Sequence, residues 1–97
     1  MSRITITGLA NSDRFASDLR SAPAEVQRAA LEAIRLLQTN PGAKSLRLHN
    51  LKGMPKPTIW KIDVYANHAW QITFEMNGQV AELKRLGTHK TIDRDPR

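Results

Sequence analysis

Apolar and polar residues alternate along several short stretches of the chain, and a period of two is typical of β-strands with one buried face. The first stretch runs from Arg3 to Thr7, where two isoleucines alternate with two threonines, and Gly8 ends it. Later stretches alternate in the same way. We therefore expect four more strands: one that begins at Leu46 and ends before Gly53, and three at 59–65, 70–76 and 79–86.

Between the first strand and the others, the apolar residues recur with the period of an α-helix. Asn11 or Ser12 can cap a first helix, because either side chain can accept a hydrogen bond from a main-chain N–H of the first turn. A second helix should run from about Pro23 to Gln38, and Thr39-Asn40-Pro41-Gly42 is a strong signal for its end. The few residues between the two helices predict an αα-hairpin.

The turn at Asn77-Gly78 indicates how the last strands are connected, because both residues tolerate the positive φ of a tight hairpin. In the final strand Val80, Leu83 and Leu86 cannot share one face of a regular strand, so we expect a β-bulge. Strands joined by such short turns pair antiparallel. The sequence thus predicts one α+β domain over residues 1–97, of order β-α-α-β-β-β-β, with the N-terminal strand and the αα-hairpin packed on one face of an antiparallel sheet.

The other face of that sheet is expected to be open to solvent, as is common for antiparallel sheets, and its side chains are candidates for a functional site. We expect residues 93–97 to form a solvated tail that leaves this face free. The polar side chains expected there are Arg47, His49, Lys61, Asp63, Tyr65, Gln71, Thr73 and Glu75.

Positive charge is concentrated in the half of the chain that is predicted to form the sheet. The net charge is +6, of which residues 1–43 contribute +1 and residues 44–97 contribute +5. No acidic residue lies between Glu32 and Asp63 in the sequence, whereas six Lys or Arg residues do. A basic Gly/Pro loop between two strands, with His49 on the polar face, suits a polyanion such as nucleic acid. A surface that is merely soluble accounts for the net charge equally well.

The cysteine content and the hydropathy of the chain indicate the compartment in which we expect the protein. The chain has no cysteine, so it has neither a disulfide framework nor a cysteine-based zinc site. Its first residues are too polar for a signal peptide, and no apolar run is long enough to span a membrane. We expect a cytoplasmic protein that needs no metal or other cofactor.

Several segments, in this order along almost the whole chain, resemble the RelE/ParE superfamily of bacterial toxins. The resemblance implies a toxin of a type II toxin–antitoxin system, held inactive by a cognate antitoxin, and the fold of the superfamily matches the architecture predicted above. The segments are the helical hairpin, Leu48-His49-Asn50-Leu51-Lys52-Gly53, Ile59-Trp60-Lys61-Ile62, Trp70-Gln71-Ile72-Thr73-Phe74 and Arg85-Leu86-Gly87-Thr88-His89.

The resemblance to the RelE branch implies a metal-independent endoribonuclease that cleaves mRNA, usually on the ribosome, and so inhibits translation. His49 and His89 match two active-site histidines of YafQ-like members, and histidine is the natural general acid or base at neutral pH. His89 could instead cap a short C-terminal helix. The implied partners are the antitoxin, mRNA and the ribosome, with operator DNA reached only through the antitoxin complex.

Further candidate site residues come from the same polar face, from the basic loop and from the last strand, whose uncertain register leaves the face of Arg85 open. Lys61 and Asp63 lie two residues apart, so Lys61 can hold a phosphate and Asp63 can orient a histidine, although a surface ion pair has the same spacing. The residues that we expect to bind RNA or phosphate are Arg47, Lys52, Lys56, Arg85 and Tyr65, the last by stacking on a base.

One position departs from the pattern of the superfamily. Many members have an arginine after the aromatic residue at Trp70, where it binds the scissile phosphate, but this chain has Gln71. A neutral amide cannot supply that charge, so Lys61, Lys52 or Arg85 would have to replace it. Two alternatives therefore stay open: a ParE-like inhibitor of DNA gyrase that is no nuclease, and an inactive homologue that only binds an antitoxin.

Overall fold

A computed structural model describes residues 4–51, 53, 57–65 and 69–97. Five strands form one sheet in the order β1-β5-β4-β3-β2; β1 runs parallel to β5, and the other neighbours are antiparallel. The predicted α+β fold with its αα-hairpin and antiparallel meander is confirmed. In chain order the elements are β1 (Gly8–Asn11), α1 (Asp13–Ser21), α2 (Ala24–Thr39), the short 3-10 helix η1 (Lys44–Leu46), β2 (His49–Asn50), β3 (Trp60–Asp63), β4 (Trp70–Asn77), β5 (Val80–Thr88) and α3 (His89–Arg94).

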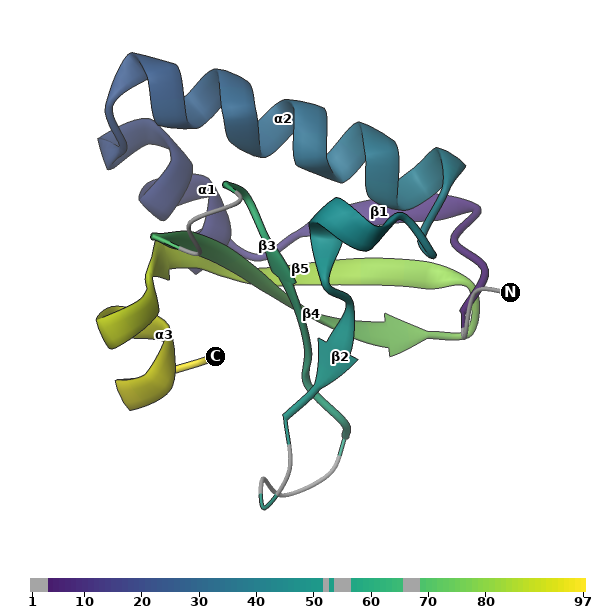
Figure 1. The fold of residues 1–97 in the computed structure, drawn as a ribbon. Coiled ribbons are helices and arrows are strands. Elements are labelled where there is room, and N and C mark those ends of the chain that lie inside the picture. Colours follow the sequence, from purple (N-terminus) through teal and green to yellow (C-terminus); the bar gives the residue numbers. More distant parts are fainter. Residues whose placement is uncertain (1–3, 52, 54–56, 66–68) are drawn as a thin grey trace.

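The helices α1 and α2 cover one face of the sheet (Figure 1). Helix α2 turns an apolar stripe that is rich in alanine toward the strands, and small side chains let a helix lie close to a sheet. Alternate residues of β3 and β4 face this stripe and are fully buried. The largest buried side chains of this core are Phe15, Leu37, Leu46, Ile62, Ile72, Phe74 and Leu83.

Ser12 ties the start of α1 to β5. Its Oγ accepts a hydrogen bond from the N–H of Phe15 at 3.0 Å, as an N-cap does, and donates one to the carbonyl of Lys84 at 3.1 Å. Its own N–H also donates to the carbonyl of Leu83. This one side chain therefore satisfies a free N–H of the helix and a carbonyl of the strand.

We expect Ser12→Ala to lower the free energy of unfolding by about 1–2 kcal/mol, because it removes both the cap and the bond to β5. Urea denaturation measures the change. Ser17→Ala, at an exposed position on the same helix, is the matched control and should cost less than about 0.5 kcal/mol. Equal losses in the two variants would contradict the capping role.

The first strand lies later in the chain than predicted. Residues 8–11 pair with Val80–Leu83, whereas Ile6 is buried in the core and Thr7 only donates one hydrogen bond to the carbonyl of Gln79. Because β1 is an edge strand with mostly exposed side chains, its residues show no alternation of apolar and polar types. The alternation at 4–7 marks where side chains enter the core, and the pairing itself begins at Gly8.

The strand predicted from Leu46 is also wrong in its first half. Leu46 is buried at the end of η1, and Arg47 then has a left-handed backbone with φ of 48°, so strand pairing begins only at His49. A 3-10 turn followed by one left-handed residue buries Leu46 without any hydrogen-bonded pairing to another strand. The predicted bulge, in contrast, is confirmed: Thr73 pairs with Arg85 and Phe74 with Leu83, which leaves Lys84 as the extra residue.

The expectation of an open polar face and a solvated tail was wrong. Residues 89–94 form α3, which lies on the side of the sheet away from α2, and the segment 95–97 crosses the polar face (Figure 1). Ion pairs and hydrogen bonds between the tail and the sheet replace the water that a polar face would otherwise bind. As a result, the following side chains of that face are buried: Lys61, Asp63, Gln71, Thr73, Glu75 and Arg85. No helix of the described residues is long and apolar enough to cross a membrane.

Candidate functional site

A row of polar residues crosses four strands on the face of the sheet that α1 and α2 leave uncovered. His49 on β2 pairs with Lys61 on β3, Lys61 pairs with Thr73 on β4, and Thr73 pairs with Arg85 on β5. Directly paired residues of a sheet project to the same side. The register thus places His49, a predicted acid/base residue, beside Lys61, a predicted phosphate ligand. Arg85, a second predicted phosphate ligand, lies at the other end of the row.

His49 begins β2, and its ring is oriented by the main chain. Its Nδ1 lies 2.6 Å from the carbonyl oxygen of Arg47. Because a carbonyl can only accept, Nδ1 must carry the proton in this contact. In the neutral imidazole, Nε2 then has a free lone pair that can accept a proton from a substrate.

His89 and Asp93 are partners on α3, one turn apart. The Nδ1 of His89 lies 3.2 Å from Oδ2 of Asp93, while the other oxygen, Oδ1, lies 4.0 Å from the Nζ of Lys61. The hydroxyl of Thr88 caps this helix by accepting from the N–H of Thr91, so His89 is the first helical residue and not the cap. His89 and Asp93 keep more than half of their side chains exposed, at 58% and 54%. Asp93 therefore links an accessible histidine to the buried end of Lys61.

Sequence reasoning missed Asp93, because it assigned residues 93–97 to a solvated tail. The signal that could have found it is the spacing of four residues from His89, which places both side chains on one face of a helix.

Asp63 is buried and contacts neither described histidine in a recorded hydrogen bond or ion pair. It accepts a hydrogen bond from Nε2 of Gln71 at 3.0 Å and lies 3.6 Å from Nη1 of Arg47. The Oε1 of Gln71 is a buried acceptor without a hydrogen-bond partner among the described residues. Gln71, at the position of the missing arginine, thus supports the carboxylate of Asp63.

Arg85 is held by carboxylates. Its Nε donates to Oδ2 of Asp18 at 2.7 Å, and the same oxygen accepts the N–H of Leu86 at 3.0 Å. Its Nη1 also lies 3.4 Å from the carboxylate of Asp95. For Arg85 to bind an RNA phosphate, as predicted, the phosphate would have to replace Asp95 while Asp18 stays in place.

The remaining predicted RNA-binding residues are more scattered. The hydroxyl of Tyr65 donates to the carbonyl of Glu25 in the first turn of α2, at 3.3 Å, which directs the ring toward the helical layer. Arg47 lies next to His49 and is mostly exposed. Lys52 and Lys56 lie outside the described residues. Within the described parts of the chain, no three His, Asp or Glu side chains gather closely enough to hold a metal ion.

The tertiary structure is similar to several solved toxins, although the sequences have diverged. YafQ from Escherichia coli has a TM-score of 0.70 at 18% identity, over 87% of this chain and 94% of YafQ. The RelE–RelB complex of Pyrococcus horikoshii has a TM-score of 0.66 at 16% identity, over 88% of this chain and 96% of the matched chain. The RelB–RelE complex of Methanococcus jannaschii has a TM-score of 0.64 at 22% identity, over 89% of this chain and 96% of the matched chain. No protein-family model and no curated protein matches the sequence.

The chain has the RelE/YafQ fold. The predicted resemblance to the RelE/ParE superfamily is thereby confirmed for the architecture.

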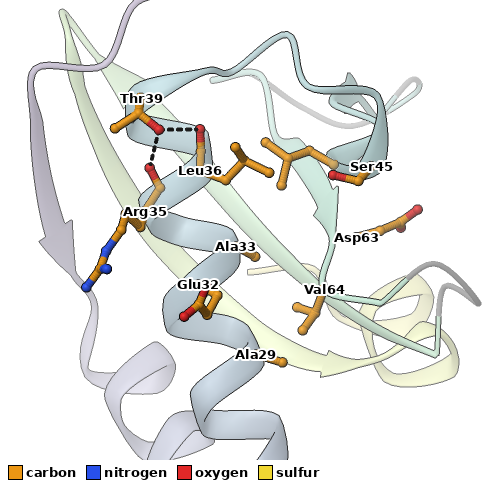
Figure 2. Close-up of a pocket in the computed structure, with 10 residues that line it drawn as sticks. Ala29, Glu32, Ala33, Arg35, Leu36, Thr39, Ser45, Asp63 and Val64 are labelled. Atoms are coloured by element: carbon orange, nitrogen blue, oxygen red, sulfur yellow. Dashed lines mark hydrogen bonds between the residues drawn. The ribbon is translucent and has the colours of Figure 1, made fainter.

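A hollow lies away from His49 and His89, between α2, η1 and the end of β3. It has a volume of about 510 Å³. Figure 2 shows Ala29 and Ala33 of α2 on one side and Val64 on the other, with Leu36 and Ser45 at the end near η1. Asp63 also lines this hollow, and Figure 2 shows its carboxylate directed away from α2. Neither His49 nor His89 lines it, so we do not assign it to the chemistry.

Proposed function

We propose that this chain is the toxin of a type II toxin–antitoxin system and that it cleaves mRNA as a metal-independent endoribonuclease. One observation carries the proposal. His49 and His89 come from different elements, β2 and α3, yet both lead to Lys61, the first by strand pairing and the second through Asp93. Two histidines around one cation are what phosphodiester cleavage by a ribose 2′-OH needs.

From their contacts we propose different roles for the two rings. The free Nε2 of His49 takes the proton from the 2′-OH as a general base, and the bond from O2′ to phosphorus forms. The bond from phosphorus to O5′ breaks, and O5′ receives a proton from His89, whose ring Asp93 orients through Nδ1. The products are a 2′,3′-cyclic phosphate and a 5′-OH, and Lys61 is placed to stabilise the charge on the phosphorane.

The partner that we propose is an antitoxin, which would act in the cytoplasm, with mRNA on the ribosome as the substrate. YafQ and the RelE proteins of similar structure are described in complexes with DinJ and RelB. The net charge of +6 favours an antitoxin segment with acidic residues on the basic half of the chain. Operator DNA would be contacted through that complex.

A second candidate function is supported by the same structure. Gln71 is neutral and supports Asp63, and Arg85 is paired with Asp18, so the row offers less available positive charge than a phosphate-cleaving site usually has. This favours a ParE-like inhibitor of DNA gyrase, or a homologue that binds its antitoxin without cleaving RNA.

Expression in bacterial cells without an antitoxin separates these candidates. We expect translation to stop within minutes and new RNA 5′ ends to map inside open reading frames. Arrested growth with intact RNA and DNA breaks would support gyrase inhibition instead. Unchanged growth at a verified protein level would contradict a toxin of either kind.

A further inference from the structure

Residues 95–97, which we call the latch, lie across the polar row instead of extending into solvent. Pro96 is buried, and its carbonyl accepts a hydrogen bond from the hydroxyl of Thr73 at 2.6 Å. The carbonyl of Asp95 accepts one from Nη1 of Arg85 at 3.1 Å. The latch therefore contacts Thr73 and Arg85, two of the four residues in the row, whereas His49 and Lys61 form the other end.

Ion pairs at both ends hold the latch in place. The Nε of Arg97 donates to Oε2 of Glu75 at 2.5 Å, and its Nη2 donates to the carbonyl of Pro57 at 2.6 Å. At the other end Arg14 donates to the carboxylate of Asp95 at 2.8 Å and to the main-chain oxygen of Arg97 at 2.5 Å. These contacts bring α1, β4 and the residues before β3 together over one short segment.

The carboxylate of Asp95 occupies a place that suits an anion. Two guanidinium groups face it, that of Arg14 at 2.8 Å and that of Arg85 at 3.4 Å, and arginine pairs bind phosphate with the same geometry. The hydrogen bond from Arg14 lowers the pKa of Asp95, so this carboxylate stays ionised at neutral pH. An RNA phosphate and Asp95 would therefore compete for the same two cations.

The latch is built to open without unfolding the domain. The ion pairs at its two ends lie at the rim, where the side chains of Asp95 and Arg97 keep 50% and 33% of their surface exposed, whereas Glu75 and the hydrogen bond from Thr73 to Pro96 are buried. Such exposed pairs add little stability, and Pro96 is the one latch residue that is fully buried. Segments held mainly by polar contacts open more readily than the apolar core.

We propose that the latch is an autoinhibitory segment: it closes the Thr73–Arg85 end of the row in the free protein, and a single-stranded RNA displaces it by binding Arg14 and Arg85 through its phosphates. This inference rests on the proposed function, in that it takes RNA as the ligand of this face. It adds a closed state that the RNA must open, and it assigns Arg14 to the RNA-binding surface.

The test compares two arginines that are three residues apart. Arg97→Ala opens the latch, whereas Arg94→Ala removes the same charge from the exposed last turn of α3, where the side chain makes no hydrogen bond or ion pair with the described residues. The probe is a single-stranded RNA with 2′-O-methyl riboses, which cannot be cleaved. Loss of a cation normally weakens binding to a polyanion. We expect Arg94→Ala to bind about 2-fold more weakly than the wild type and Arg97→Ala to bind about 10-fold more tightly.

A second pair of variants opens the latch from the side of the sheet. Glu75→Gln removes the partner of Arg97, and Glu82→Gln, its pairing neighbour on β5, removes the same charge without touching the latch. We expect the first variant to bind several-fold more tightly than the second. If Arg97→Ala weakens binding as Arg94→Ala does, or if both glutamine variants bind equally, the latch is contradicted. Circular dichroism verifies the fold of each variant.

The outcome for the latch can be separated from the outcome for the nuclease. Wild-type protein that cleaves RNA, with Arg97→Ala no different from Arg94→Ala in binding and rate, would keep the nuclease and reject the latch. Protein that cleaves no RNA, with tighter binding in Arg97→Ala alone, would reject the nuclease and keep the latch.

Discussion

The variant His49→Ala/His89→Ala should lose RNA cleavage by at least about 10³-fold in single-turnover rate, while its fold stays intact. A proton-transfer residue contributes about 10²–10⁴-fold, and residues that act in one step are not additive, so the double loss should be smaller than the product of the single ones. His49 is only partly buried and His89 is exposed, so neither substitution leaves a large cavity. His68→Ala is the control for loss of a histidine elsewhere in the chain.

A modified substrate separates the two roles. If the 5′-oxygen at the cleavage site is replaced by sulfur, the leaving thiolate needs no proton, so the general acid becomes dispensable. We expect this substrate to restore most of the rate to His89→Ala and little of it to His49→Ala. Rescue of His49→Ala instead would reverse the assignment, and full activity of the double variant on ordinary RNA would reject both histidines.

The second large effect concerns stability. Asp18→Ala should lower the free energy of unfolding by about 3 kcal/mol, because it leaves the largely buried guanidinium of Arg85 with less compensation. The side chains of Arg85 and Asp18 are only 10% and 20% exposed, and Asp18 also accepts the N–H of Leu86. This contact ties α1 to β5 in addition to the bonds of Ser12. Urea denaturation with an unchanged m-value measures the loss.

Asp13→Ala is the matched control, since Asp13 lies on the same helix, is exposed and has only the favourable position in the first turn to lose. Its cost should stay near 0.5 kcal/mol. Adding Arg85→Met to Asp18→Ala should recover part of the loss, because removing both charges costs less than stranding one. A loss in Asp18→Ala no larger than that in Asp13→Ala would mean that water or Asp95 compensates Arg85.

The elements expected from the apolar and polar pattern agree with the structure at β4 and at the bulge of β5, and differ from it at Leu46. The alternation in 70–76 predicted β4 to within one residue, because its apolar side chains stand at every second position, the period that the pleat imposes on one face of a strand. The mismatch of Val80, Leu83 and Leu86 correctly indicated a bulge, since only an extra residue lets Leu83 and Leu86 both enter the core. The strand predicted to begin at Leu46 was wrong, because a 3-10 turn can bury a leucine as well as a strand can.

Some residues of the candidate site were also predicted from the sequence, and others were found only in the structure. His49 and Lys61 could be placed on one face from spacing alone, whereas the irregular last strand left the face of Arg85 open; the strand register puts all three in one row. Their roles remain predictions. Asp93 could have been found from its spacing of four residues to His89, whereas Arg14 could not, because its contact to Asp95 comes from a segment that lies far away in the sequence.

By itself, the sequence determined the α+β architecture, the helical hairpin, the antiparallel meander and the position of the histidines relative to the apolar face. These features follow from short-range periodicity, caps and turns, which each residue carries with it. Only the tertiary structure decided that the polar face is covered by α3 and the latch. A polar sheet surface satisfies its hydrogen bonds equally well with water or with a polar segment of the same chain, and the residue pattern is identical in both cases.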